Sequence, residues 1–126
     1  MNVAALIARL LLGLVFLAFG LNGFLNFMPG ALPPGPAGEF LRLLAQSHYD
    51  LVVSALQVAG GVLLLVNRYV PLALVLLGPV IVNIFLYHLL LDPSGLPVVI
   101  LVVILWGIVF LRHRQYFSGI FVQRAS

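Results

Sequence analysis

The chain contains no cysteine and very few charged residues. The missing cysteines exclude disulfides, thiolate metal sites and iron–sulfur clusters ligated by this chain. Charged residues make up 7% of the sequence, whereas a soluble domain carries about 25%. So few charges cannot cover a globule with a polar surface, and we therefore predict a membrane protein.

Acidic residues are scarcer than basic ones, and the net charge is +3. The six basic residues are all arginines, and most of them lie at the ends of apolar runs. This placement is typical of membrane topology and does not indicate nucleic-acid binding. The 126 residues, 63% of them hydrophobic, suit one bundle and no second domain.

Four apolar runs are each long enough to cross a hydrocarbon core of about 30 Å. They cover residues 3–27, 50–67, 70–91 and 95–112. The breaks at 67–71 and 92–95 are short, so consecutive spans should be antiparallel neighbours. The fold class that we predict is an all-α membrane protein, an antiparallel four-helix transmembrane bundle.

The segment between the first two runs has a different composition. Residues 28–38 are rich in proline and glycine and predict a loop. Residues 37–47 place Phe40, Leu43 and Leu44 on one helical face and polar side chains on the other. We predict a short amphipathic helix that lies at the membrane surface.

Four spans place both termini on one side of the membrane. Five of the arginines would share that side with the tail 113–126, namely Arg9, Arg68, Arg112, Arg114 and Arg124. Arg42 alone would share the other side with the three acidic residues. The positive-inside rule then predicts that both termini are cytoplasmic.

Polar side chains inside the spans are the candidate functional residues, because polar groups are costly at membrane depth. Arg9 lies near the start of the first span, and the others gather in the half that faces away from the cytoplasm. The set comprises Arg9, Asn22, Gln57, Asn83, Tyr87 and His88. These groups could bond one another and hold the helices together. Alternatively, they could line a cavity for a lipophilic ligand such as a quinone or an isoprenoid.

Other chemistry finds less support. His48 and His88 could ligate a haem, but His48 begins a helix beside Asp50 and is better explained as an interfacial residue. A metal site from these histidines and Asp92 would have little carboxylate support, so we predict no metal. No nucleophile–base or acid–base pair is visible at one depth, so we predict no catalytic residues and favour a protein that is not an enzyme by itself.

Several motifs together resemble the DoxX family over nearly the whole chain. They are Ala8–Phe16, Phe19–Phe24, Gln57–Leu65, Asn67-Arg68, Pro71–Leu74, and Pro79 with Asn83 and His88. The resemblance implies a four-helix protein of the bacterial inner membrane. Some relatives belong to redox complexes, among them a thiosulfate:quinone oxidoreductase and a mycobacterial complex that acts against oxidative stress. The family commonly has glutamate where this chain has Gln57, and a glutamine cannot relay a proton.

The function that we predict is a non-catalytic membrane subunit of a redox-linked complex that binds a quinone or another lipophilic ligand in its polar interior. Its partners would be the bilayer, a redox protein and further copies of the chain, with no nucleic acid. One alternative is a structural or self-assembling bundle without a ligand. A small transporter is less favoured, because no acidic residue lies inside a span and the halves show no repeat.

Overall fold

The computed structural model describes residues 3–25 and 32–124, and the described chain is built from helices. The long helices are α1 (Val3–Leu25), α3 (Tyr49–Val66), α4 (Val70–Leu90) and α5 (Leu96–His113), and the shorter α2 spans Pro36–Gln46. Two 3₁₀ helices, η1 (Pro93–Gly95) and η2 (Arg114–Phe121), precede and follow α5. The predicted bundle and the predicted short helix are both present. The first span was predicted to reach residue 27, and residues 26 and 27 lie outside the described residues.

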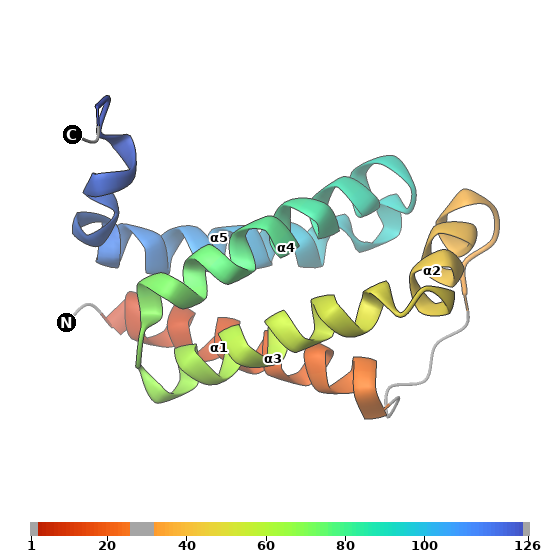
Figure 1. Ribbon diagram of the computed structural model, residues 1–126, viewed down its shortest axis with the longest axis horizontal. Helices are drawn as coiled ribbons and strands as arrows, with labels where there is room; N and C mark the ends of the chain where they lie inside the picture. The colour runs from red at the N-terminus through yellow and green to blue at the C-terminus, as the bar shows by residue number, and fades with distance from the viewer. Residues whose placement is uncertain (1–2, 26–31, 125–126) are drawn as a thin grey trace.

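Four helical segments are long and apolar enough to cross a membrane. Successive spans are antiparallel, and both ends of the described chain lie at one end of the bundle (Figure 1). Helix α1 packs against α3 and α5, and α4 packs against the same two helices. The four spans therefore form a square around one core, which confirms the predicted all-α four-helix bundle and defines a multi-pass membrane protein.

Helices α1 and α3 form the closest pair, because glycines let their backbones meet. A Cβ atom built on Gly61 would lie 2.7 Å from the Leu17 nitrogen and 2.8 Å from the Gly13 carbonyl oxygen. A Cβ on Gly20 would lie 2.8 Å from the Val58 nitrogen. Lipid tails provide no hydrophobic force between helices, so such close van der Waals contact is what holds a pair together.

Helix α5 is tied to α4 by Trp106. Its indole Nε1 donates to the Leu74 carbonyl oxygen of α4 at 3.1 Å. The indole also stacks on Phe110, with ring centroids 5.3 Å apart. The ring of Phe110 in turn contacts that of Phe117 in η2, with centroids 4.9 Å apart. These rings link α4, α5 and η2.

Trp106→Phe should lower the free energy of unfolding by about 1 kcal/mol or more, because a smaller aromatic ring remains and the hydrogen bond is lost. Unfolding by SDS in mixed micelles would measure the change. Phe110→Leu serves as the control for stacking. Unchanged stability of Trp106→Phe would show that the bond to Leu74 contributes nothing.

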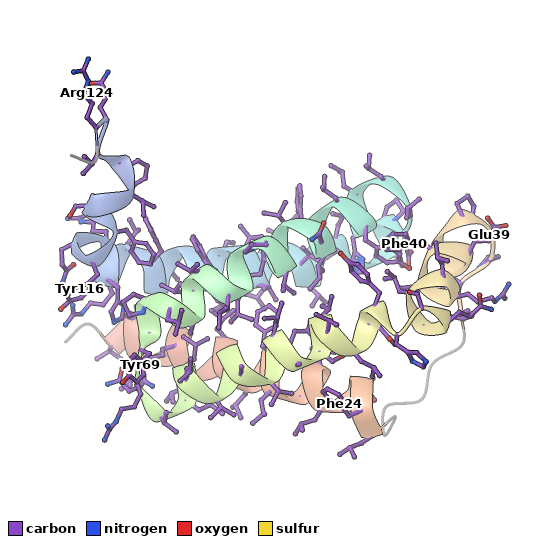
Figure 2. All side chains as sticks on the ribbon, viewed as in Figure 1. Phe24, Glu39, Phe40, Tyr69, Tyr116 and Arg124 are labelled. Carbon is purple, nitrogen blue, oxygen red and sulfur yellow. The ribbon has the colours of Figure 1, made fainter. Side chains whose placement is uncertain are left out.

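Residues 113–126 were assigned to a tail, and within it residues 114–121 form η2. In Figure 1 this segment turns away from the bundle axis. Phe117 is its buried residue, and Tyr116 and Phe121 are exposed. Figure 2 shows Tyr116 and Arg124 on this projecting arm, with Tyr69 at the same end of the molecule.

Candidate functional site

A pocket of about 300 Å³ lies inside the bundle, between the α1–α3 pair and the α4–α5 pair. All four spans contribute to its lining, which consists of Val15, Phe16, Phe19, Gln57, Ile81, Ile84, His88, Val98, Val99 and Val102. Its volume is at the lower end of the range for ligand pockets. The walls are apolar except for two side chains, Gln57 and His88.

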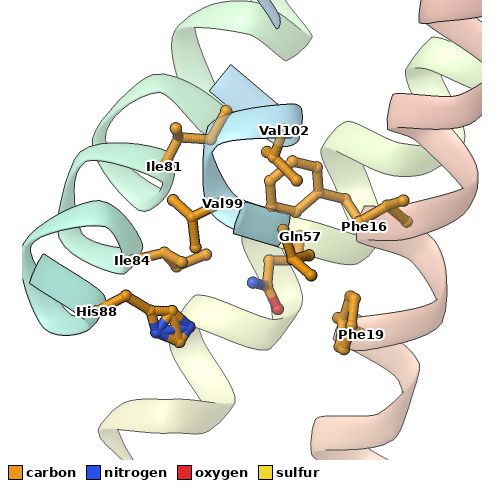
Figure 3. Close-up of a pocket in the computed structure, with 10 residues that line it drawn as sticks. Phe16, Phe19, Gln57, Ile81, Ile84, His88, Val99 and Val102 are labelled. Atoms are coloured by element: carbon orange, nitrogen blue, oxygen red, sulfur yellow. The ribbon is translucent and has the colours of Figure 1, made fainter. Parts of the chain in front are cut away.

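The two polar side chains come from different helices and meet at one end of the pocket. Gln57 lies in the first half of α3 and is 9% exposed, whereas His88 lies in the last turn of α4. Figure 3 shows both side chains turned toward the same space, with Phe19 opposite them. Because α3 and α4 are antiparallel, the start of one lies beside the end of the other, and this end of the bundle also carries α2 (Figure 1).

Neither polar side chain is paired within residues 3–25 and 32–124. Among the described residues, none forms a hydrogen bond with the Gln57 side chain, and the buried His88 Nδ1 has no hydrogen-bond partner. A buried polar atom without a partner costs about 1–3 kcal/mol. These two groups therefore do not form the interhelical network that was one of the two sequence interpretations.

Gly95 positions the imidazole of His88. A Cβ built on Gly95 would lie 2.7 Å from both Cδ2 and Nε2 of His88, so the ring rests against the backbone at the start of α5. The ring of Tyr87 lies 4.9 Å from that of His88 and 5.8 Å from that of Phe40 in α2. A chain of aromatic rings thus connects the short helix α2 to the wall of the pocket, and Figure 2 shows Phe40 at this junction.

The pocket opens sideways. Phe16 and Val99 are 2% and 3% exposed, whereas Phe19 and Val98 are 49% and 60% exposed. Phe16 and Phe19 belong to α1, and Val98 and Val99 belong to the neighbouring helix α5. The lining of the pocket therefore extends from the buried core to the exposed surface between these two helices. In a membrane this surface faces lipid, and a lipophilic molecule could enter without crossing water.

Of the predicted site residues, the structure brings Gln57 and His88 into the pocket and places the others elsewhere. Tyr87 is half-buried beside His88, and Asn22 is half-buried on α1 outside the lining. Asn83 was expected in the interior but is exposed on the outer face of α4, because α4 turns its Leu77–Val80–Ile81 side to the core.

Arg9 does not lie at the pocket either. Its guanidinium is buried against the last turn of α3, where Nη1 donates to the Leu64 carbonyl and to the Leu65 carbonyl at 3.4 Å. The final carbonyls of a helix lack intrahelical donors and carry partial negative charge. Arg9 therefore stabilises the end of a helix, which is a structural role.

The apolar lining could not be predicted from the sequence. Phe16, Ile84 and Val99 are ordinary residues in spans that are apolar on every side, so no periodic pattern separates the inner face from the outer one. Gly95 was assigned to a turn, and its contact with His88 depends on how α4 meets α5. His48 is exposed at the start of α3, and no cluster of three or more potential metal ligands occurs within 3–25 and 32–124.

Comparisons with known proteins identify no relative: the chain matches no family model, no curated protein and no solved structure. The fold defines the class of protein, which is a multi-pass all-α membrane protein.

Proposed function

We propose that this chain is a DoxX-like, non-catalytic membrane subunit that binds a lipophilic ligand with a polar head group, in the first instance a quinone. The observation that carries the proposal is the apolar pocket with the side chains of Gln57 and His88 at one end. Neither side chain has a hydrogen-bond partner among the described residues, and His88 Nδ1 is buried. A quinone carbonyl accepts hydrogen bonds, and both a glutamine amide and an imidazole N–H donate them. The apolar part of the ligand would fill the remainder of the pocket.

The absence of an acid at Gln57 limits the role of the pocket. The amide can orient a head group but cannot take up its protons. We assign the redox chemistry to a partner protein, in keeping with the redox complexes to which the DoxX resemblance points. The same resemblance and the arginine distribution support a bacterial inner membrane with cytoplasmic termini.

The first test is mass spectrometry of an organic extract of the gently purified protein, with an absorbance spectrum recorded beforehand. We expect a quinone or isoprenoid close to one molecule per chain. Phospholipid alone, without a chromophore, would contradict the proposal and favour a structural bundle.

Gln57→Leu should lower ligand retention about two- to tenfold, since it removes one net hydrogen bond of about 0.5–1.5 kcal/mol. The protein should still be expressed and folded, because the amide has no partner within the described chain. Retained ligand per chain, quantified in the extract, is the measurement. Asn83→Leu removes an amide from the same half of the bundle but outside the pocket, so it serves as the matched control. Equal retention in Gln57→Leu and the unmodified chain would reject this site.

A further inference from the structure

Asn83 is an exposed amide in the middle of a membrane span. Helix α4 covers Val70–Leu90, so Asn83 lies about 4.5 Å from its midpoint and about 10 Å from its last residue. No hydrogen bond joins its side chain to another described residue. In the described parts of the four spans, every other polar side chain away from the helix ends is buried or half-buried.

An isolated chain would turn this amide toward lipid. Moving an amide from water into a medium without hydrogen bonds costs about 4–8 kcal/mol. At this depth no water can compensate the cost, and polar residues in spans usually face protein or a water-filled cavity. Asn83 faces neither in the single chain, so a further molecule should cover this face of α4.

We infer that the molecule covering this face is a second copy of the chain, and that the two Asn83 side chains bond each other. Copies inserted in the same direction are related by an axis along the membrane normal, so each residue meets its counterpart at the same depth. An asparagine has both an amide donor and a carbonyl acceptor, so two of them satisfy each other reciprocally. A different protein would need its own polar group at that depth.

The surface around Asn83 suits helix packing. Val82 and Leu86 both lie on one side of it on the outer face of α4 and are 57% and 44% exposed. Both also line an apolar groove of about 390 Å³ between α4 and α5, with Val103 and Trp106 on its far side. A groove beside a helix can receive side chains of a neighbouring helix. The pocket of Gln57 and His88 opens between α1 and α5, so the association does not depend on the proposed ligand.

The chain contains no cysteine, which allows a direct test by disulfide cross-linking. Leu86→Cys places one thiol on the Asn83 face, and Leu14→Cys places one at mid-depth on the exposed face of α1, where Leu14 is 55% exposed. In native membranes, oxidised Leu86→Cys should give several times more covalent dimer than Leu14→Cys. Adding Asn83→Leu to Leu86→Cys should remove most of that excess. Equal cross-linking from both positions would overturn the inference.

A second measurement uses the purified full chain in phosphatidylcholine vesicles, with energy transfer between labelled copies. Asn83→Leu should raise the dissociation constant about 3- to 15-fold, and Asn83→Gln, which keeps donor and acceptor, should raise it less. Thermal unfolding of each variant would check that the bundle remains folded. Unchanged association of Asn83→Leu would overturn the inference. Cross-linking in native membranes without association of the purified chain would also overturn it, because another protein would then cover this face.

Discussion

Replacing Gly61 with leucine should lower the free energy of unfolding by about 3 kcal/mol or more, the upper range for overpacking. The first added carbon would lie 2.7 Å from the Leu17 nitrogen and 2.8 Å from the Gly13 carbonyl oxygen. Both atoms belong to the backbone of α1, so no side-chain rotation can relieve the overlap. The whole α1–α3 pair would have to separate, and with it the side of the pocket formed by Phe16 and Gln57.

The matched control is Gly107→Leu. No atom lies within 4 Å of a Cβ built on Gly107, so the same substitution in another span should be nearly neutral. Unfolding in SDS-titrated micelles would compare the two variants. Gly60→Leu should also be destabilising, since its Cβ would lie 2.6 Å from Cγ of Leu77, a fully buried side chain. Equal stability of Gly61→Leu and Gly107→Leu would contradict the close α1–α3 packing.

Replacing Arg9 with methionine should lower the free energy of unfolding by about 2 kcal/mol. Methionine fills similar space but leaves the Leu64 carbonyl, at the end of α3, without its charged donor. A hydrogen bond to a charged group contributes about 1.5–3 kcal/mol, and a cation near the C-terminus of a helix adds a favourable dipole interaction. The same micelle titration would measure the loss.

Two further arginine variants separate the contact from the charge. Arg9→Lys keeps a cation near the end of α3 without the guanidinium fork, and should recover part of the loss. Arg68→Met removes an exposed arginine from the same end of the bundle, and should change stability by less than about 0.5 kcal/mol. If Arg9→Met and Arg68→Met were equally stable, the contact with α3 would have no structural importance.

The fold class could be predicted because it follows from chain properties that need no tertiary information. Long apolar runs must become helices in lipid, since only there are all backbone groups satisfied within one segment. The polar breaks at 67–71 and 92–95 are too short for anything except antiparallel neighbours. The short helix was expected at 37–47 and is found at Pro36–Gln46. It could be predicted because the helical spacing of Phe40, Leu43 and Leu44 is visible in the local sequence.

The site could be predicted only in part. Polarity at membrane depth singled out Gln57 and His88, which do line the pocket. The same criterion singled out Arg9 and Asn83, which lie at the end of α3 and on the outer face of α4. Polarity marks a residue as costly in lipid, but it does not say whether the compensation comes from a cavity, a helix terminus or another chain.

Apolar run length and polar breaks were therefore enough to predict a membrane location, the number of possible spans and the polar side chains that need an explanation in lipid. Which face of each span turns inward became visible only in the packed bundle. Soluble helices reveal that face through an apolar stripe, but lipid is as apolar as a protein core, so these spans carry no such stripe. The choice is made instead by close contacts between distant residues, such as Gly13 with Gly61 and Gly95 with His88.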